Sequence, residues 1–141
     1  MDIASAVEGH VFESERLARR YFELLGNGVD AGMLEIVHPE VEVALRSHPG
    51  EVLHGRDAVA DFVSSISDRF YEAVAEVYRP VDEHRIVVEG RLRWTDDEHV
   101  MRDTPIAWAL VFRDGLLLRS FPAPSALEAE SILSALPPEE E

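Results

Sequence analysis

The sequence predicts one α+β domain, in which a curved, mostly antiparallel sheet wraps as a cone around N-terminal helices and a further helix follows at the C-terminal end. Three observations lead to this prediction. Apolar residues recur with the helical period in residues 14–25 and 56–69. Strand-like segments follow one another from residue 72 to residue 121, and a helical pattern returns after them. The length of 141 residues suits a single domain that buries a core and keeps a pocket.

Two helices are expected before the first strand. Ser14 has a side chain that can cap a helix, and the Gly-Asn-Gly at 26–28 ends that helix because glycine accepts the left-handed conformation of a C-terminal cap. Asp30 is expected to begin a short second helix that runs through Val37. Pro39 stops it, since the residue before a proline is disfavoured in a helix.

The next segments are expected to form a strand, a loop, a helix and a second strand. Residues 41–45 alternate with the period of a strand, and residues 47–55 have the composition of a loop. A third helix is expected over residues 56–69, because its apolar residues share one helical face. Another strand is expected over residues 72–81.

Two long strands and a hairpin are expected next. In residues 85–94 alternate side chains separate into an apolar face, with Ile86, Val88, Leu92 and Trp94, and a charged face, with Arg85, Glu89, Arg91 and Arg93. The segment PIAWALVF is apolar on both faces, which is typical of a central strand. The Arg-Asp-Gly at 113–115 predicts a tight turn into the last strand, because Asp-Gly accepts the positive φ angles that such turns need.

Ser125 and Glu128 form a capping box, which predicts the start of the final helix. We expect this final helix and the three earlier helices to lie on one side of the sheet. We expect a loosely ordered segment over 1–12, one domain over 13–136 and an acidic tail over 137–141.

Composition limits the classes of function. The formal net charge of −15 disfavours binding to nucleic acid or to an anionic membrane, because phosphate groups repel such a surface. The absence of cysteine excludes disulfides and thiolate metal sites. The N-terminus lacks the pattern of a signal peptide, and no apolar run has membrane-spanning length, so we expect a cytoplasmic protein. We expect no metal and no cofactor.

The order of elements resembles the NTF2-like superfamily, which includes ketosteroid isomerases, SnoaL-type polyketide cyclases and limonene-epoxide hydrolases. The segments that carry the resemblance are ARRYFELLGNGV with MLEIVHPEVEVAL, then HGRDAVADFV, then ALVFRDGLLLRSF with the helix that follows. They span roughly residues 14–135. The resemblance implies a cone-shaped fold with a ligand cavity, but one fold of this kind supports many activities.

For isomerase chemistry the resemblance points to Tyr21, which matches a tyrosine that donates a hydrogen bond to the developing oxyanion. The mechanism also needs a carboxylate base and usually a second, protonated acid. The base position falls near Leu45, or on Ala44 if the register slips by one, and the second acid falls on Trp108. None of these side chains can take up or release a proton at neutral pH, so the standard isomerase mechanism is excluded. The alternative is that Tyr21 packs in a helix interface with its hydroxyl satisfied.

The other two activities of the superfamily also lack their residues. Epoxide hydrolases of this fold use an Arg-x-Asp pair, and the nearest equivalent, Arg91-Leu92-Arg93, has no acid in the third place. In the cyclases an aspartate at the end of the last strand is thought to be the base, and Ser125 occupies that place. A serine can cap the helix, but its hydroxyl is no general base at neutral pH.

Several remaining residues are weaker candidates for a site. His48 and Arg46 follow the first strand and could line a cavity mouth, where a histidine could act as a base. The loop histidines His38 and His54 lack the spacing of metal ligands. The residues suited to the cavity wall are Leu45, Phe62, Ile66, Trp94 and Trp108. The alternative is that these side chains fill the cone as core, which is the favoured role for Phe62 and Ile66.

The first hypothesis is therefore a SnoaL-like protein that binds a small, mostly apolar organic molecule. Tyr21 would be the polar anchor and Trp108 a wall. If the protein is an enzyme, proton transfer or isomerisation next to a carbonyl is expected, with Tyr21 as hydrogen-bond donor and His48 as the candidate base. The alternative is a non-catalytic module that binds a ligand or a protein, with its cone filled by side chains.

By resemblance, we also expect a homodimer that forms through the outer face of the sheet. The alternation of Glu89, Arg91 and Arg93 would make that interface polar, with charges that could pair across a two-fold axis.

Overall fold

The computed structural model describes residues 11–26, 34–46, 50–66 and 69–136 of the chain. Its helices and strands follow the order α2 (Glu13–Gly26), β1 (Val37–Ala44), β2 (Val52–His54), α3 (Arg56–Ser65), β3 (Tyr71–Pro80), β4 (Arg85–Thr95), β5 (Met101–Arg113), β6 (Leu116–Ala123) and α4 (Ala126–Ala135). Most of the expected N-terminal segment and all of the acidic tail lie outside the described residues.

The strands form one mixed sheet with the order β2-β1-β6-β5-β4-β3. Every neighbouring pair is antiparallel except β1 and β6, which run parallel. The predicted α+β cone is confirmed, and β5 is an interior strand, as its two apolar faces predicted. The parallel pair places Val43 opposite Ser120, so that the end of β1 lies beside the middle of β6.

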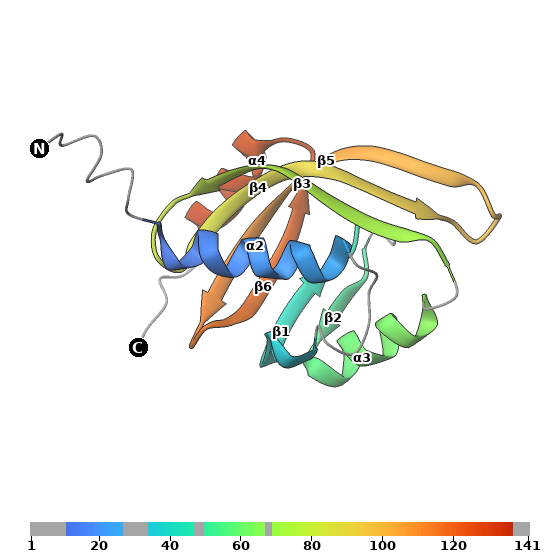
Figure 1. The fold of residues 1–141 in the computed structure, drawn as a ribbon, viewed down its shortest axis with the longest axis horizontal. Helices are drawn as coiled ribbons and strands as arrows, with labels where there is room; N and C mark the ends of the chain where they lie inside the picture. The colour runs from blue at the N-terminus through green and yellow to red at the C-terminus, as the bar shows by residue number, and fades with distance from the viewer. Residues whose placement is uncertain (1–10, 27–33, 47–49, 67–68, 137–141) are drawn as a thin grey trace, which may run out of the picture.

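The helices lie on both faces of the sheet (Figure 1). α2 crosses the concave inner face, and α3 packs near β1 and β2 at the same side. α4 lies against the outer face, over β4, β5 and β6. The expectation that all helices share one side is therefore wrong. The outer side chains of β5 are apolar, and α4 removes them from water through a second core that includes Ala107, Ala109, Val111, Ala129 and Leu133.

Gly90 allows the sheet to curve strongly where β3 crosses β4. A Cβ atom at this position would lie 1.8 Å from the carbonyl oxygen of Val74, so no other residue fits without a backbone shift. The register of β3 against β4 also shifts between Ala75 and Val77. Such a bulge increases the local twist of a strand, and here it lets β3 fold over the inner face.

Helix α2 begins differently from the expectation. Ser14 lies inside the helix, is fully buried, and donates its hydroxyl hydrogen bond to the carbonyl of Asp82 at 2.7 Å. The turn between β3 and β4 thus binds this side chain, which sequence alone assigned to the helix cap. The bond fastens α2 to the sheet, and the buried face of the helix carries Leu17, Ala18 and Tyr21 into the inner core.

The expected second helix is wrong in its C-terminal half. Val37 and Pro39 belong to strand β1, and only residues 34–35 form a single helical turn; residues 27–33 lie outside the described chain. Val37 pairs with Leu117 of β6, and its carbonyl accepts a hydrogen bond from the Arg56 guanidinium at 2.8 Å. Pro39 is exposed at the position where the register of the pair shifts, and a proline, having no N–H, is tolerated there.

The other elements lie close to their predicted positions. The short strand β2 occupies part of the predicted loop, because His54 pairs with Glu42 across the edge of the sheet. α3 ends at Ser65, earlier than expected. The tight turn is confirmed by positive φ angles at Asp114 and Gly115. Ser125 caps α4, as predicted, by accepting a hydrogen bond from the backbone N–H of Glu128 at 3.3 Å.

Candidate functional site

A cavity of about 60 Å³ lies between α2, α3 and the inner face of the sheet. Its wall is mostly apolar. The residues that line it are Tyr21, Val37, Val43, Ala44, Leu45, Arg46, Leu53, Val59, Phe62, Val63, Tyr71, Ala73, Leu92, Trp108, Leu117 and Ser120. Because an apolar cavity of about 150 Å³ is enough to bind benzene, this space accepts a narrow group and excludes a fused ring system unless the walls move.

Two buried hydroxyl groups meet in this wall, one from a helix and one from a strand. Tyr21 comes from α2 and Ser120 from β6; their exposed fractions are 6% and 2%. A hydrogen bond joins the two side chains. Burial raises the pKa of Tyr21 well above its ordinary value, the neighbouring Tyr71 raises it further, and the bond with Ser120 opposes the shift. The phenol therefore stays protonated and can donate a hydrogen bond.

Sequence reasoning missed Ser120 because a bulge changes the side on which it lies. From Leu117, whose side chain faces inward, strict alternation would direct Ser120 outward. The pairing of β5 with β6 skips Leu118, so Leu118 joins the outer core and Ser120 faces the cavity. No feature of the segment LLLRSF indicates the bulge, since it arises from pairing with β5.

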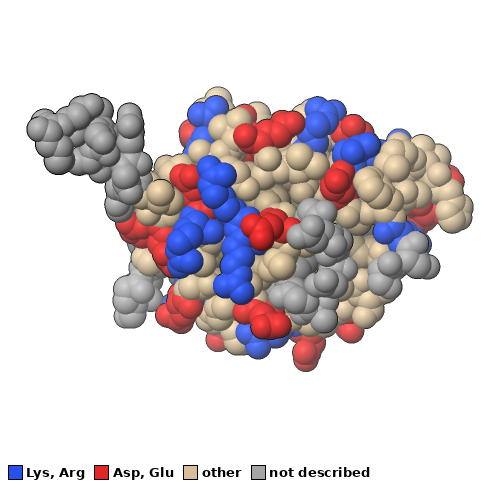
Figure 2. Space-filling view, viewed as in Figure 1, with Lys and Arg blue, Asp and Glu red and all other residues tan. Residues whose placement is uncertain are grey.

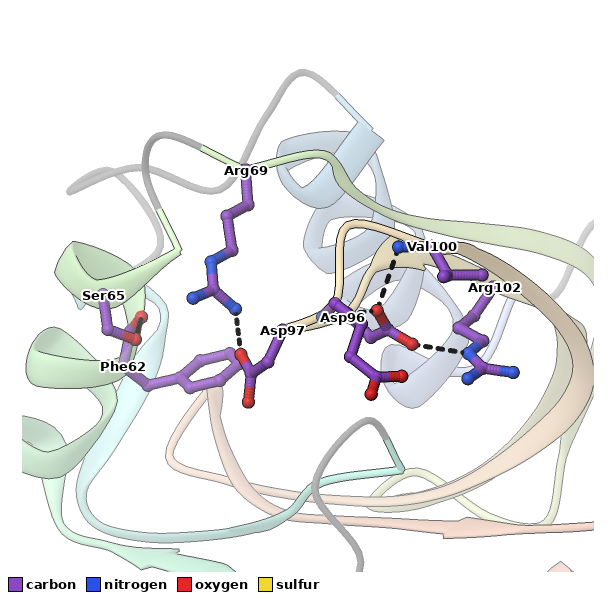
Figure 3. Close-up of polar contacts among 8 residues, drawn as sticks. Phe62, Ser65, Arg69, Asp96, Asp97, Val100 and Arg102 are labelled. Atoms are coloured by element: carbon purple, nitrogen blue, oxygen red, sulfur yellow. Dashed lines mark hydrogen bonds and ion pairs between the residues drawn. The ribbon is translucent and has the colours of Figure 1, made fainter.

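Phe62 and Tyr71 form the side of the cavity between α3 and β3. Their rings meet edge to face, with centroids 5.7 Å apart, and both side chains are partly exposed. Figure 3 shows Arg69, just before β3, reaching Asp97 at the tip of the β4–β5 hairpin, 2.6 Å from nitrogen to oxygen. This ion pair joins the hairpin tip to the segment that carries Tyr71.

That hairpin tip is ordered by Asp96. Its carboxylate accepts hydrogen bonds from the backbone N–H groups of Glu98 and Val100 and from Arg102, as Figure 3 shows for the last two. The bond from Val100 is the main reason that the pKa of Asp96 lies below its usual value, with Arg102 adding to the effect. Asp97 is therefore held where Arg69 can reach it.

The structure gathers four of the seven residues proposed from sequence into the cavity wall. These are Tyr21, Leu45, Phe62 and Trp108. Ile66 is buried beside α3 and Trp94 is half-buried on β4, and neither lines the cavity. His48 lies outside the described residues. Tyr71 and Ser120 belong to the wall without having been proposed, and Arg46 lines it, as expected for a residue at the mouth.

None of the described lining residues is a carboxylate or a histidine. Ala44, Leu45 and Trp108, which stand at the acid positions implied by the resemblance, all line the cavity as apolar groups. Ser125 is exposed at the start of α4 and does not reach it. The chemistry available from the described wall is hydrogen bonding by hydroxyl groups in an apolar environment, together with one guanidinium.

Other classes of site find no support in the described part of the chain. No three His, Cys, Asp or Glu side chains come together there in a way that could hold a metal ion. No described helix is both long and apolar enough to cross a membrane. His54 pairs with Glu42 at 3.3 Å, and Glu42 also pairs with Arg119 at 3.3 Å, which makes a small charged group on the sheet rather than a ligand set.

The charges expected at a dimer interface pair within the chain. Glu89 pairs with Arg79, Arg91 lies 2.8 Å from Asp103, and Arg93 lies 3.0 Å from Glu72. α4 covers part of the same outer face. The homodimer remains a prediction, and these internal pairs leave fewer charges to join two subunits than the sequence suggested.

Solved structures with the same fold come from several organisms. A proposed polyketide cyclase from Xanthomonas campestris pv. campestris is 24% identical, with a TM-score of 0.66 over 82% of this chain and 93% of that one. A Δ5-3-ketosteroid isomerase from Mycobacterium sp. is 16% identical, with a TM-score of 0.69 over 84% and 97%. A Mycobacterium tuberculosis protein in complex with estradiol-17β-hemisuccinate is 13% identical, with a TM-score of 0.69 over 79% and 91%. At these identities the likeness shows the fold alone.

No curated protein sequence matches the chain significantly. A family model described as a SnoaL-like domain matches residues 18–120. This match covers most of the chain, from α2 to the buried serine of β6, and so includes every element that builds the cavity. The chain therefore belongs to the SnoaL-like domain family and has the NTF2-like fold.

Proposed function

We propose that this protein binds a small, mostly apolar organic molecule in the cavity, with an oxygen atom of that molecule hydrogen-bonded to Tyr21 and Ser120. The observation that carries the proposal is the pairing of these two buried hydroxyls in an otherwise apolar wall. Apolar pockets with a few convergent polar groups are the usual form of small-molecule sites, because the apolar wall supplies affinity and the polar groups fix orientation.

The volume of the cavity narrows the class of molecule. A space of about 60 Å³ suits a short chain or a single methyl ketone or enol group rather than a steroid nucleus. A larger ligand would need Phe62 and Tyr71 to separate, since these rings form the partly exposed side of the wall. We therefore assign the site to small carbonyl or hydroxyl compounds.

A second candidate function is proton transfer next to a carbonyl. Tyr21 supports it, because a phenol held protonated by burial can stabilise a developing enolate oxygen. The names of similar structures, a ketosteroid isomerase and a proposed polyketide cyclase, agree with such chemistry. The base is unassigned among the described lining residues, and His48 remains the candidate from sequence. Binding without turnover is the function that the described wall supports better.

Thermal unfolding with added ligand tests the proposal. A ligand that binds only the folded state raises the melting temperature in proportion to its affinity and concentration. The panel contains small cyclic enones, lactones and methyl ketones, each beside a hydrocarbon of the same shape. The oxygenated member of each pair is expected to give the larger shift.

Tyr21→Phe is the variant for this assay, and Tyr78→Phe, on the β3 surface away from the cavity wall, is its matched control. In Tyr21→Phe the oxygenated ligands should bind about tenfold more weakly and lose their advantage over the hydrocarbons, as expected for the loss of one buried hydrogen bond. In Tyr78→Phe their affinity should not change. Equal shifts for ketones and hydrocarbons, or no shift for any compound with a folded protein, would contradict the proposal. Conversion of a β,γ-unsaturated ketone to its conjugated isomer, followed by ultraviolet absorbance, tests for turnover.

A further inference from the structure

We propose that the cavity selects ligands that carry a carboxylate at the end opposite their carbonyl or hydroxyl oxygen, and that Arg46 is the residue that recognises this carboxylate. The inference rests on the proposed function and adds the chemical class of the ligand. It would make the natural ligand an amphipathic acid, such as a keto acid with a slender chain.

Arg46 is the cation that lines the cavity. It follows β1, is exposed, and also lines a shallow groove on the outside of the same segment, together with Gly50, Glu51 and Val52. Arg46 makes no hydrogen bond or ion pair within the described chain, and the Glu51 carboxylate beside the groove is not paired with it. A guanidinium with its donors unused can bind a carboxylate through two parallel hydrogen bonds.

Most arginines of the described chain do have an ion pair. Nine other arginines pair with a carboxylate of the described chain. On the face drawn in Figure 2, red side chains adjoin most of the blue ones. With 28 acidic residues against 13 basic ones, a surface arginine in this protein readily finds a carboxylate. An arginine at the rim of a cavity that has no ion pair with the described chain can therefore offer its donors to a ligand.

The polar groups of the cavity lie at two separate places. Ser120, which is 2% exposed, stands opposite Val43 in the parallel pairing of β1 and β6. Arg46 lies three residues beyond Val43, in a bend after the end of β1, and three residues of chain span at most about 10 Å. The wall between them is apolar, with Leu45 and Leu53. A ligand that uses both places needs an oxygen at one end, an apolar middle and an anion at the other end.

A carboxylate suits this site better than a phosphate. The formal net charge of −15 repels a dianion about twice as strongly as a monoanion. One guanidinium can form a bidentate pair with one carboxylate. The small volume of the cavity also favours a slender chain that ends outside it, near Arg46.

The test compares each acid with its own amide. The probes are 5-oxohexanoate, 6-oxoheptanoate and 7-oxooctanoate and their primary amides, measured by calorimetry or by the fluorescence of Trp108, which lines the cavity. The wild-type protein is expected to bind the best acid about tenfold more tightly than its amide, because a hydrogen bond to a charged group is stronger than one to a neutral group. This preference should decrease as salt is added.

Arg46→Gln should abolish the preference, because it should lower the affinity for the acids much more than the affinity for the amides. Arg20→Gln is the matched control, since Arg20 is also exposed and lacks an ion pair with the described chain, lies on α2 and does not line the cavity. The control should retain the full preference.

The possible results separate the two proposals. If wild type binds acids and amides equally well, or if Arg46→Gln keeps the preference, the role of Arg46 is overturned while the binding function stands. If neither acids nor amides bind to the folded protein, the proposed function fails for ketones, and the assignment of Arg46 fails with it.

Discussion

The inner and outer faces of the β4–β5 hairpin are made from alternate residues of the same two strands, but the two faces differ in burial and in charge. On the inner face Val88, Leu92 and Leu110 are buried in the core, and Leu92 also lines the cavity, whose wall contains few polar groups. On the part of the outer face that α4 leaves uncovered, Arg91, Arg93 and Asp103 stay partly exposed and pair with one another or with β3. The inner face is shielded from bulk water, and α4 shields part of the outer face in the same way, whereas the uncovered part of the outer face stays hydrated and charged.

The comparison teaches that the number of polar contacts is a poor guide to their importance. Each outer ion pair is screened by water and contributes little to the free energy of unfolding. The hydroxyls of Tyr21 and Ser120 on the inner face are buried, so removing one member leaves the other without its partner and is more costly. The predictions below test this contrast, in order of decreasing effect.

Leu110→Ala should show the largest loss. Leu110 is fully buried on the inner face, and truncation leaves a void as well as removing apolar contacts. We expect the free energy of unfolding to fall by about 3–4 kcal/mol. Leu127→Ala on α4 is the control, because Leu127 is 73% exposed and its truncation should cost less than about 0.5 kcal/mol. Urea denaturation measures the free energy of unfolding of both variants. Similar losses in the two variants would show that burial on the inner face does not set the cost.

Gly90→Ala should cost about 3 kcal/mol, because the added Cβ meets a backbone carbonyl and not a side chain that could move away. Gly115→Asn is a suitable control. It lies in the hairpin turn with φ +77° and open space around it, where asparagine is tolerated. Denaturation curves with equal midpoints for Gly90→Ala and wild type would mean that β3 does not press against β4 as described.

Tyr21→Phe and Ser120→Ala should each lower the free energy of unfolding by about 1–2 kcal/mol, since each leaves a buried hydroxyl without its partner or removes its bond. The double variant should cost clearly less than the sum of the two, with a coupling of about 1 kcal/mol. Additive losses would indicate that the two hydroxyls do not interact in solution.

Arg91→Gln and Asp103→Asn should have the smallest effects. The two side chains are 41% and 43% exposed, and we expect each substitution to cost less than about 1 kcal/mol, with the coupling vanishing in high salt. A coupling as large as that of Tyr21 with Ser120, measured at physiological salt by the same denaturation cycle, would contradict the difference between the two faces.

Much of the architecture could be predicted from sequence, because it depends on local periodicity. The helical period identified α2 and α3, and strict alternation assigned the two faces of β4. Turn chemistry located the bend at Asp114 and Gly115, and the capping box located the start of α4. Tyr21, which the resemblance and the apolar face of its helix suggested as a site residue, lines the cavity.

Tertiary contacts decided the features that local patterns do not encode. Val37 is in a strand because it pairs with β6, and Ser14 binds the Asp82 carbonyl because a distant turn offers that acceptor. Ser120 faces the cavity because the pairing of β5 and β6 skips one residue. The sequence by itself determined most of the helices, strands and turns, since those preferences act within a few residues. Only the packed structure decided which polar groups meet inside the cone, since a shift of one residue in strand pairing reverses the face of every side chain that follows.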